Sequence, residues 1–266
     1  MRILTYHKVL DKSNFEKQLK YLKRNNYNVL NLKSFINKIE NKESFKKKDI
    51  FLTFDDGDYS VFENAMPLLK KYNMAAAVFV ITDLINSNKP FWWDEIKYYT
   101  GNPNDVRRVK KIKNEERLDY ISKLHESKKP KYTQKQLSIK DLKEMESNGI
   151  SICNHTCSHP MLDKVTEHEL DKELSNSLKF LKDNEFEFSN IIAYPNGNTN
   201  LEVIKHLEKN QFRLGFVFNH RIFKNSDLPF NISRLSVNDY TPIWKYKLII
   251  SGLHSKFLNL KKKLKK

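Results

Sequence analysis

One short stretch constrains the fold of this 266-residue chain more than any other. Residues 50–54 (I-F-L-T-F) are almost wholly apolar, and two adjacent carboxylates, Asp55 and Asp56, follow directly before Gly57. A short apolar run bounded by charges and a glycine is typical of a buried strand. In α/β folds the carboxyl ends of such strands carry the chemistry. Because two ionised carboxylates repel each other, this pair requires a cation or a shared proton.

Most of the chain alternates between strand-like and helix-like segments. Asn14 precedes an apolar helical face and is expected to cap that helix, while Ser138 and Asp141 resemble a capping box at the start of another. A strongly amphipathic helix is expected over residues 167–181. We expect strands near residues 2–7, 27–30, 50–54, 75–81, 150–154, 191–194, 215–218 and 232–237. This alternation predicts a parallel sheet or barrel.

The alternation breaks between about residues 86 and 136. This stretch opens with K-P-F-W-W-D at residues 89–94 and continues as charged, helix-like sequence. It is too long for an ordinary connection. We therefore interpret it as a largely helical insertion that covers or flanks a site.

The formal charge of +16 results from 48 basic and 32 acidic residues. The lysines are spread among asparagines over the whole length, so no basic stripe indicates a nucleic-acid partner. The exception is the basic tail at residues 258–266, which favours either peripheral contact with an anionic membrane or a solvated end.

Export and disulfide signals are weak in this sequence. Only two cysteines occur, Cys153 and Cys157, so we expect no disulfide framework. The first residues become polar too early for a signal peptide, and no apolar run approaches the roughly 20 residues that span a bilayer. We therefore expect a cytoplasmic protein.

Two histidines can supply the cation that the acidic pair requires. His155 and His159 directly follow the predicted strand at residues 150–154. Imidazoles and a carboxylate are suitable ligands for a divalent transition metal, whose bound water becomes a usable nucleophile. The second carboxylate of the pair is then a candidate base. Either pattern alone also describes an ordinary turn or helix face, but both follow strands of one alternating fold.

In these motifs the chain resembles the polysaccharide deacetylases, also called the NodB-homology or carbohydrate esterase 4 family. The resemblance rests on T-F-D-D-G at residues 53–57, H-T-C-S-H at 155–159 and A-Y-P-N-G at 193–197, with Y-H-K-V at 6–9 and S-R-L-S-V at 233–237. It implies a distorted (β/α)7 barrel over residues 1–257, with the insertion and the tail outside the pattern. It also implies hydrolysis of an N- or O-acetyl group on a sugar.

The resemblance assigns roles to the paired acids and the histidines. Asp56, His155 and His159 would bind the metal, with zinc expected first and cobalt, nickel or manganese as alternatives. Asp55 would be the general base. In the third motif, a backbone amide that helps hold the oxyanion corresponds to Asn196.

The third motif also departs from the family pattern. Tyr194 and Pro195 are expected to contact the substrate, and a branch of the family shares this Tyr-Pro pair. Many members have an arginine that orients the base where this chain has Ala193. We predict that Arg234, from the last strand, takes that role.

The general acid stays unassigned, because the usual Leu-x-His near the C-terminus has no clean match. His220 and His254 lie in the right half of the chain without the right setting. His7 follows a predicted strand and is a candidate for substrate contact. Trp92 and Trp93 can stack on a sugar or pack the insertion onto the barrel; adjacent tryptophans rarely face the same way, so we expect one of each.

These features predict a metal-dependent enzyme that removes an acetyl group from an N-acetylated amino sugar of a surface glycan or its precursor. Two alternatives stay open. One is a non-catalytic carbohydrate-binding relative that keeps the metal site, and the other is a hydrolase of a non-sugar amide.

Overall fold

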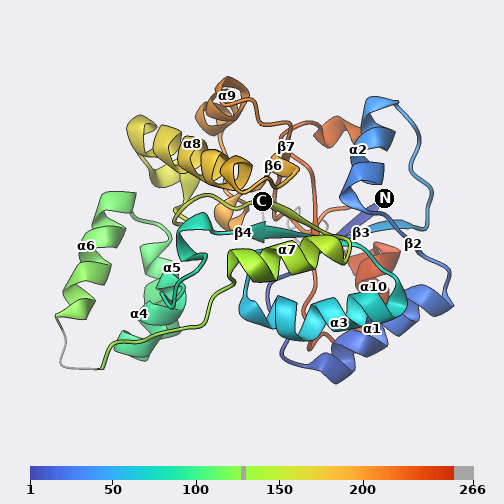
Figure 1. Cartoon of the computed structure of the whole chain (residues 1–266), viewed down its shortest axis with the longest axis horizontal. Coiled ribbons are helices and arrows are strands. Elements are labelled where there is room, and N and C mark those ends of the chain that lie inside the picture. Colours follow the sequence, from blue (N-terminus) through green and yellow to red (C-terminus); the bar gives the residue numbers. More distant parts are fainter. Residues whose placement is uncertain (127–129, 255–266) are drawn as a thin grey trace, which may run out of the picture.

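The computed structural model of the chain describes residues 1–126 and 130–254 (Figure 1). Its strands pair in parallel in the order β7-β6-β5-β4-β3-β1-β8, and β2 also pairs with β3. The strands are β1 (Arg2–Tyr6), β2 (Asn28–Val29), β3 (Asp49–Phe54), β4 (Ala76–Val80), β5 (Ile150–Asn154), β6 (Phe188–Ala193), β7 (Leu214–Phe216) and β8 (Leu235–Ser236).

The last strand segment joins the two edges of this sheet. Leu235 and Ser236 of β8 pair with β1, and Ile232 just before them bridges to Phe216 of β7. The sheet is therefore curled, with helices around it, and the predicted distorted barrel is confirmed. Only part of the strand predicted at residues 232–237 is regular, because this segment changes partners along its length.

Helices cover the outside of the curled sheet (Figure 1). They are α1 (Lys12–Arg24), α2 (Leu32–Glu40), α3 (Met66–Tyr72), α7 (Ile139–Ser147), α8 (Glu167–Asp183), α9 (Leu201–Lys209) and α10 (Ile243–Ser251). The capping box of Ser138 and Asp141 is confirmed at the start of α7. The cap predicted at Asn14 is wrong: Asp11 caps α1, and its side chain accepts a hydrogen bond from the Asn14 backbone N–H.

The predicted insertion is largely helical. It contains α4 (Trp92–Thr100), α5 (Pro103–Val109) and α6 (Asn114–His125), which Figure 1 shows grouped at one side of the barrel. Ile96, Val106 and Val109 form a small core with Trp92 and with Met161 of the barrel. The insertion thus packs onto the barrel at Met161, which lies two residues after His159 in the chain.

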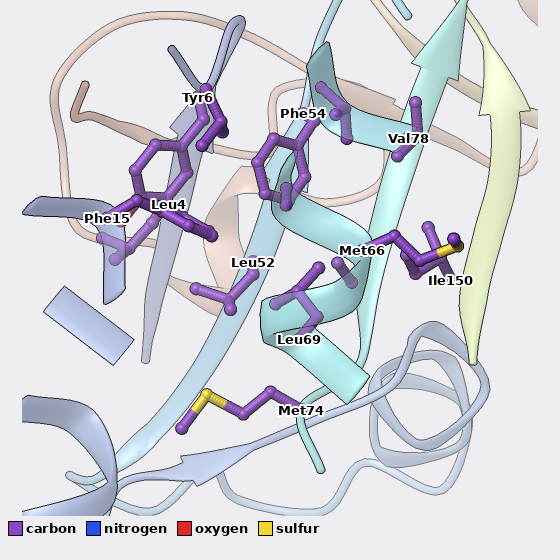
Figure 2. Close-up of a cluster of buried hydrophobic side chains, with 14 of the residues drawn as sticks. Leu4, Tyr6, Phe15, Leu52, Phe54, Met66, Leu69, Met74, Val78 and Ile150 are labelled. Atoms are coloured by element: carbon purple, nitrogen blue, oxygen red, sulfur yellow. The ribbon is translucent and has the colours of Figure 1, made fainter. Parts of the chain in front are cut away.

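Strand β3 is buried at every residue. Leu52 and Phe54 pack with Phe15 and Leu69 beneath α1 and α3 (Figure 2). Phe51 packs in a second cluster on the opposite face, where its ring centroid lies 6.4 Å from that of Phe216. The predicted buried strand is confirmed, and both of its faces are covered.

Both cysteines are buried and free. No helix in the described part of the chain is long and apolar enough to cross a membrane. The basic tail at residues 258–266 lies outside the described residues, so membrane contact through it stays a prediction.

Replacing Leu52 by alanine should lower the free energy of unfolding by about 2–5 kcal/mol, because the side chain is fully buried and would leave a cavity. Urea denaturation followed by circular dichroism measures this loss. Leu201→Ala is the matched control, since Leu201 is 78% exposed, and it should change stability little. Equal losses in the two variants would contradict the proposed packing of β3.

Candidate active site

The paired acids leave β3 in different directions. The Asp55 backbone N–H still donates to the Tyr6 carbonyl at 2.9 Å, which extends the β1–β3 ladder by one residue. Asp56 then takes a φ of 71° and Gly57 a φ of 69°, so the chain turns sharply. As a result, the two carboxylates contact different partners.

Asp56 faces the two histidines that follow β5. Its Oδ1 lies 3.3 Å from His155 Nε2 and 3.5 Å from His159 Nε2, and one donor atom from each residue lies within 4.8 Å of the others. His155 Nδ1 lies 2.7 Å from the Ala193 carbonyl, which can only accept a hydrogen bond. Nδ1 therefore carries the proton, and the Nε2 lone pair faces Asp56, as in metal-binding histidines.

The electrostatics of the cluster favour an ionised Asp56. Burial by itself raises the pKa of Asp56, but the contact with His155 and the nearby His7 and His159 together hold that pKa well below its ordinary value. Burial, and then His155, lower the pKa of His159 well below its ordinary range. The cluster thus presents an ionised Asp56 carboxylate, the form that binds a metal.

Asp55 is paired with Arg234. The guanidinium donates from Nη1 to Oδ1 at 2.7 Å and from Nη2 to Oδ2 at 2.8 Å, and its Nε donates to the Val217 carbonyl at 3.1 Å. Arg234 is fully buried, and its guanidinium carbon lies 5.5 Å from the ring centroid of Phe79 and 5.9 Å from that of Phe216. Such a two-pronged contact restricts the orientation of the carboxylate plane.

A cavity of about 270 Å³ opens beside these groups. The barrel contributes His7, Asp55, Asp56, His155, His159, Asn196, Gly197 and Phe218 to its lining, and the insertion contributes Trp93, Lys97, Val106 and Lys110. The expectation that the insertion flanks a site agrees with this lining. The cavity lies at the carboxyl ends of the strands, as the motif positions predict.

A sequence model described as polysaccharide deacetylase matches residues 42–215, more than half of the chain. The chain belongs to the polysaccharide deacetylase family. It is 28% identical over 241 residues to poly-beta-1,6-N-acetyl-D-glucosamine N-deacetylase of Staphylococcus aureus (strain MRSA252), an alignment that covers 86% of this chain and 68% of that protein. The chain is therefore an enzyme of the carbohydrate deacetylase class, which acts on N-acetyl amide bonds. Deacetylases of this family depend on a metal, and Asp56, His155 and His159 can hold one.

Solved structures of other deacetylases share the fold. Streptococcus pyogenes deacetylase PplD, solved with acetate, aligns with a TM-score of 0.71 over 95% of this chain and 97% of its own, at 21% identity. IcaB from Ammonifex degensii aligns with a TM-score of 0.67 over 94% and 95%, also at 21% identity. At this level of identity the likeness shows the fold alone, which is the distorted barrel described above.

The two tryptophans of this deacetylase have different surroundings. The Trp92 ring is buried, and its indole N–H donates to the His159 carbonyl at 3.1 Å. The Trp93 ring lines the cavity, with its centroid 4.6 Å from that of His159, and it stacks on Phe91. The two indole planes are 83° apart, which favours packing for Trp92 and leaves Trp93 as the candidate for substrate contact.

Two residues of the third motif line the cavity, and two are buried behind its wall. Tyr194 and Pro195 are buried and outside the lining, and the Tyr194 hydroxyl donates to the Phe230 carbonyl at 2.8 Å. Their surroundings favour packing over the predicted substrate contact. Asn196 and Gly197 line the cavity, with φ values of 57° and 75°. A Cβ on Gly197 would lie 2.5 Å from the Phe218 backbone nitrogen, so only glycine fits this turn.

Sequence reasoning missed the cavity lysines. Lys110 Nζ donates to the Asn196 side-chain oxygen at 3.0 Å, which joins the insertion to the third motif. Lys97 also lines the cavity and pairs with Asp94 at 2.8 Å. The only signal for either was its position in the insertion, because lysines are frequent throughout the chain.

The pairing of Asp55 with Arg234 predicts strong thermodynamic coupling. Arg234→Met should lower the free energy of unfolding by roughly 3–5 kcal/mol, because it leaves a buried carboxylate without its counter-charge. The double variant Asp55→Asn/Arg234→Met should lose much less than the sum of the two single losses, which a double-mutant cycle in urea measures.

The matched control for this cycle is the exposed pair of Arg213 and Glu40. Arg213→Met should cost at most about 1 kcal/mol, since water screens an exposed ion pair. Additive losses at Asp55 and Arg234 would show that the two side chains do not stabilise each other.

Proposed function

We propose that this chain is a metal-dependent hydrolase that removes the acetyl group from N-acetylated hexosamine units of a glycan or glycan precursor. The observation that carries the proposal is the arrangement of the two acids in one cavity: Asp55 is held by Arg234, and Asp56 faces His155 and His159. The similarity to a poly-beta-1,6-N-acetyl-D-glucosamine N-deacetylase over 86% of this chain supports an N-acetylated hexosamine as the substrate unit.

Asp56, His155 and His159 are the proposed metal ligands. The buried His159 Nδ1 has no hydrogen-bond partner among residues 1–126 and 130–254. In the same residues the Asp56 carboxylate forms ion pairs with the two imidazoles and with no lysine or arginine. Two imidazoles and one carboxylate suit zinc best, with cobalt, nickel and manganese as alternatives. When bound there, such an ion would supply a positive charge that polarises the acetyl carbonyl and lowers the pKa of water at the site.

Asp55 is the proposed general base. It lines the cavity, and each of its carboxylate oxygens keeps a second lone pair after accepting one hydrogen bond from Arg234. Arg234 is a positioning residue, since it acts on the substrate only through Asp55. In this reaction water adds to the acetyl carbon, Asp55 takes the proton of that water, and the C–N bond then breaks.

The remaining roles fall to Asn196 and His7. The Asn196 backbone amide is the proposed donor to the oxyanion, since its left-handed turn places this residue in the cavity wall. The departing amine needs a proton, and His7 is the proposed donor. Apart from His155 and His159, it is the one histidine in the lining that the described residues form. Acetate and the free amino sugar are the products.

Of the two alternatives, a non-catalytic binding protein is the less compatible with this site. The buried pair of Asp55 and Arg234 orients a base that sugar binding alone does not use. A non-sugar amide would meet the same catalytic groups, so the choice of substrate rests on the relatives.

Replacing Asp55 by asparagine should leave the metal content unchanged and reduce acetate release by at least about 100-fold, because the variant has no base but keeps its metal ligands. Acetate released from N-acetylglucosamine oligomers, measured beside metal analysis, tests this outcome. Asp119→Asn, an exposed change on α6, should keep full activity. Turnover in the Asp55 variant at the parent rate would rule out the assigned base.

Replacing His7 by glutamine should lower kcat by about 100- to 10,000-fold while the metal content stays constant, because the amine would leave without a proton donor. Substrates with a better leaving group should recover much of the loss. His254→Gln is the control, since His254 does not line the cavity. A change confined to KM would instead assign His7 to substrate binding.

A further inference from the structure

A second cluster of carboxylates surrounds a buried histidine between α8 and α9. These two helices lie side by side on the outside of the barrel (Figure 1). His206 of α9 is only 4% exposed. Glu167 and Asp171 come from the first two turns of α8, and Glu202 lies one turn before the histidine on α9. None of these four residues lines the active-site cavity.

The hydrogen bonding of His206 leaves one ring nitrogen without a proton. Its Nδ1 lies 3.0 Å from the Glu202 backbone carbonyl, which can only accept, so Nδ1 carries the hydrogen. Nε2 is then a bare lone pair, and it is buried without a hydrogen-bond partner in the described part of the chain. Histidines that bind metals usually donate their other N–H in this way.

The bare nitrogen points toward anionic oxygens. Glu167 Oε1 lies 3.7 Å and Asp171 Oδ1 lies 3.6 Å from His206 Nε2, and this Asp171 oxygen is also buried without a partner in residues 1–126 and 130–254. These distances are too long for hydrogen bonds to a protonated ring. Two ligands at about 2.1 Å from one ion in tetrahedral geometry lie roughly 3.4 Å apart, which is close to the distance of each carboxylate oxygen from His206 Nε2.

Neighbouring lysines leave the inner oxygens of the cluster available. Lys209 Nζ pairs with Asp171 Oδ2 at 2.8 Å, and Lys205 Nζ lies 3.6 Å from Glu202 Oε2. Neither contact uses Asp171 Oδ1 or Glu202 Oε1, and Glu202 Oε1 lies 3.6 Å from His206 Nδ1. One donor atom each from Glu167, Glu202 and His206 lies within 4.8 Å of the others.

We propose that Glu167, Glu202 and His206, with Asp171 as a further ligand, form a second site for a divalent cation. An imidazole with carboxylates suits Zn²⁺ or a similar transition metal better than Mg²⁺ or Ca²⁺, which prefer oxygen ligands alone. The site is structural. Helix α8 follows the loop of His155 and His159, and α9 follows the loop of Asn196, so the ion would fasten together the helices that follow two active-site loops.

Metal stoichiometry tests this proposal on the full chain. After chelation, reloading with Zn²⁺ and dialysis, the parent protein should hold two equivalents of zinc, and His206→Gln should hold one. Glu167→Gln/Asp171→Asn should also hold one, and it keeps the buried histidine in case that substitution disturbs folding. Glu208→Gln, an exposed change on α9, is the control and should hold two. Equal zinc contents in the parent protein and in His206→Gln would overturn the proposal.

Thermal unfolding separates this site from the active site. In the His155→Ala/His159→Ala background, added Zn²⁺ should still raise Tm as its concentration rises, because it binds the folded state. The rise should vanish when Glu167→Gln/Asp171→Asn is added to that background. A rise that persists in the combined variant would overturn the assignment of these ligands. Neither readout depends on deacetylase activity.

Discussion

The buried ion pair between Asp55 and Arg234 is the interaction on which the active site depends. A charge without a partner in the core costs several kcal/mol, so neither side chain is tolerated there alone. Asp55 extends the central strand β3, whereas Arg234 lies in the segment that joins β7 to β1. Asp55, the proposed base, therefore acquires its partner only when the barrel closes. Closure of the sheet is thus coupled to the arrangement of the cavity.

The same strand end also separates two charges that would otherwise repel each other. Asp55 stays in line with the β1–β3 ladder and contacts the arginine, while the left-handed turn at Asp56 directs the second carboxylate to the histidines. Each acid thus has its own source of positive charge. Adjacent carboxylates can then have different roles, one oriented as a base and the other available to a metal.

The insertion completes a site that the barrel alone leaves open. Trp93 forms part of the wall beside His159, and Lys110 contacts the side chain of Asn196. The core of the insertion includes Met161 of the barrel, so its position is coupled to the histidine loop.

Local patterns in the sequence determined the buried strand β3, the capping box at Ser138 and the amphipathic helix at residues 167–181. They also determined the family motifs that contain Asp55, Asp56, His155 and His159. These features depend on residues close together in the chain. The sequence also suggested Arg234 as the partner of the base, but only the tertiary structure brings the two together across 179 residues. It alone shows that Tyr194 packs inward, that Lys97 and Lys110 line the cavity, and that α8 and α9 converge on His206. Periodicity reports the local direction of a side chain, whereas contacts between distant segments depend on strand register, closure of the barrel and helix packing.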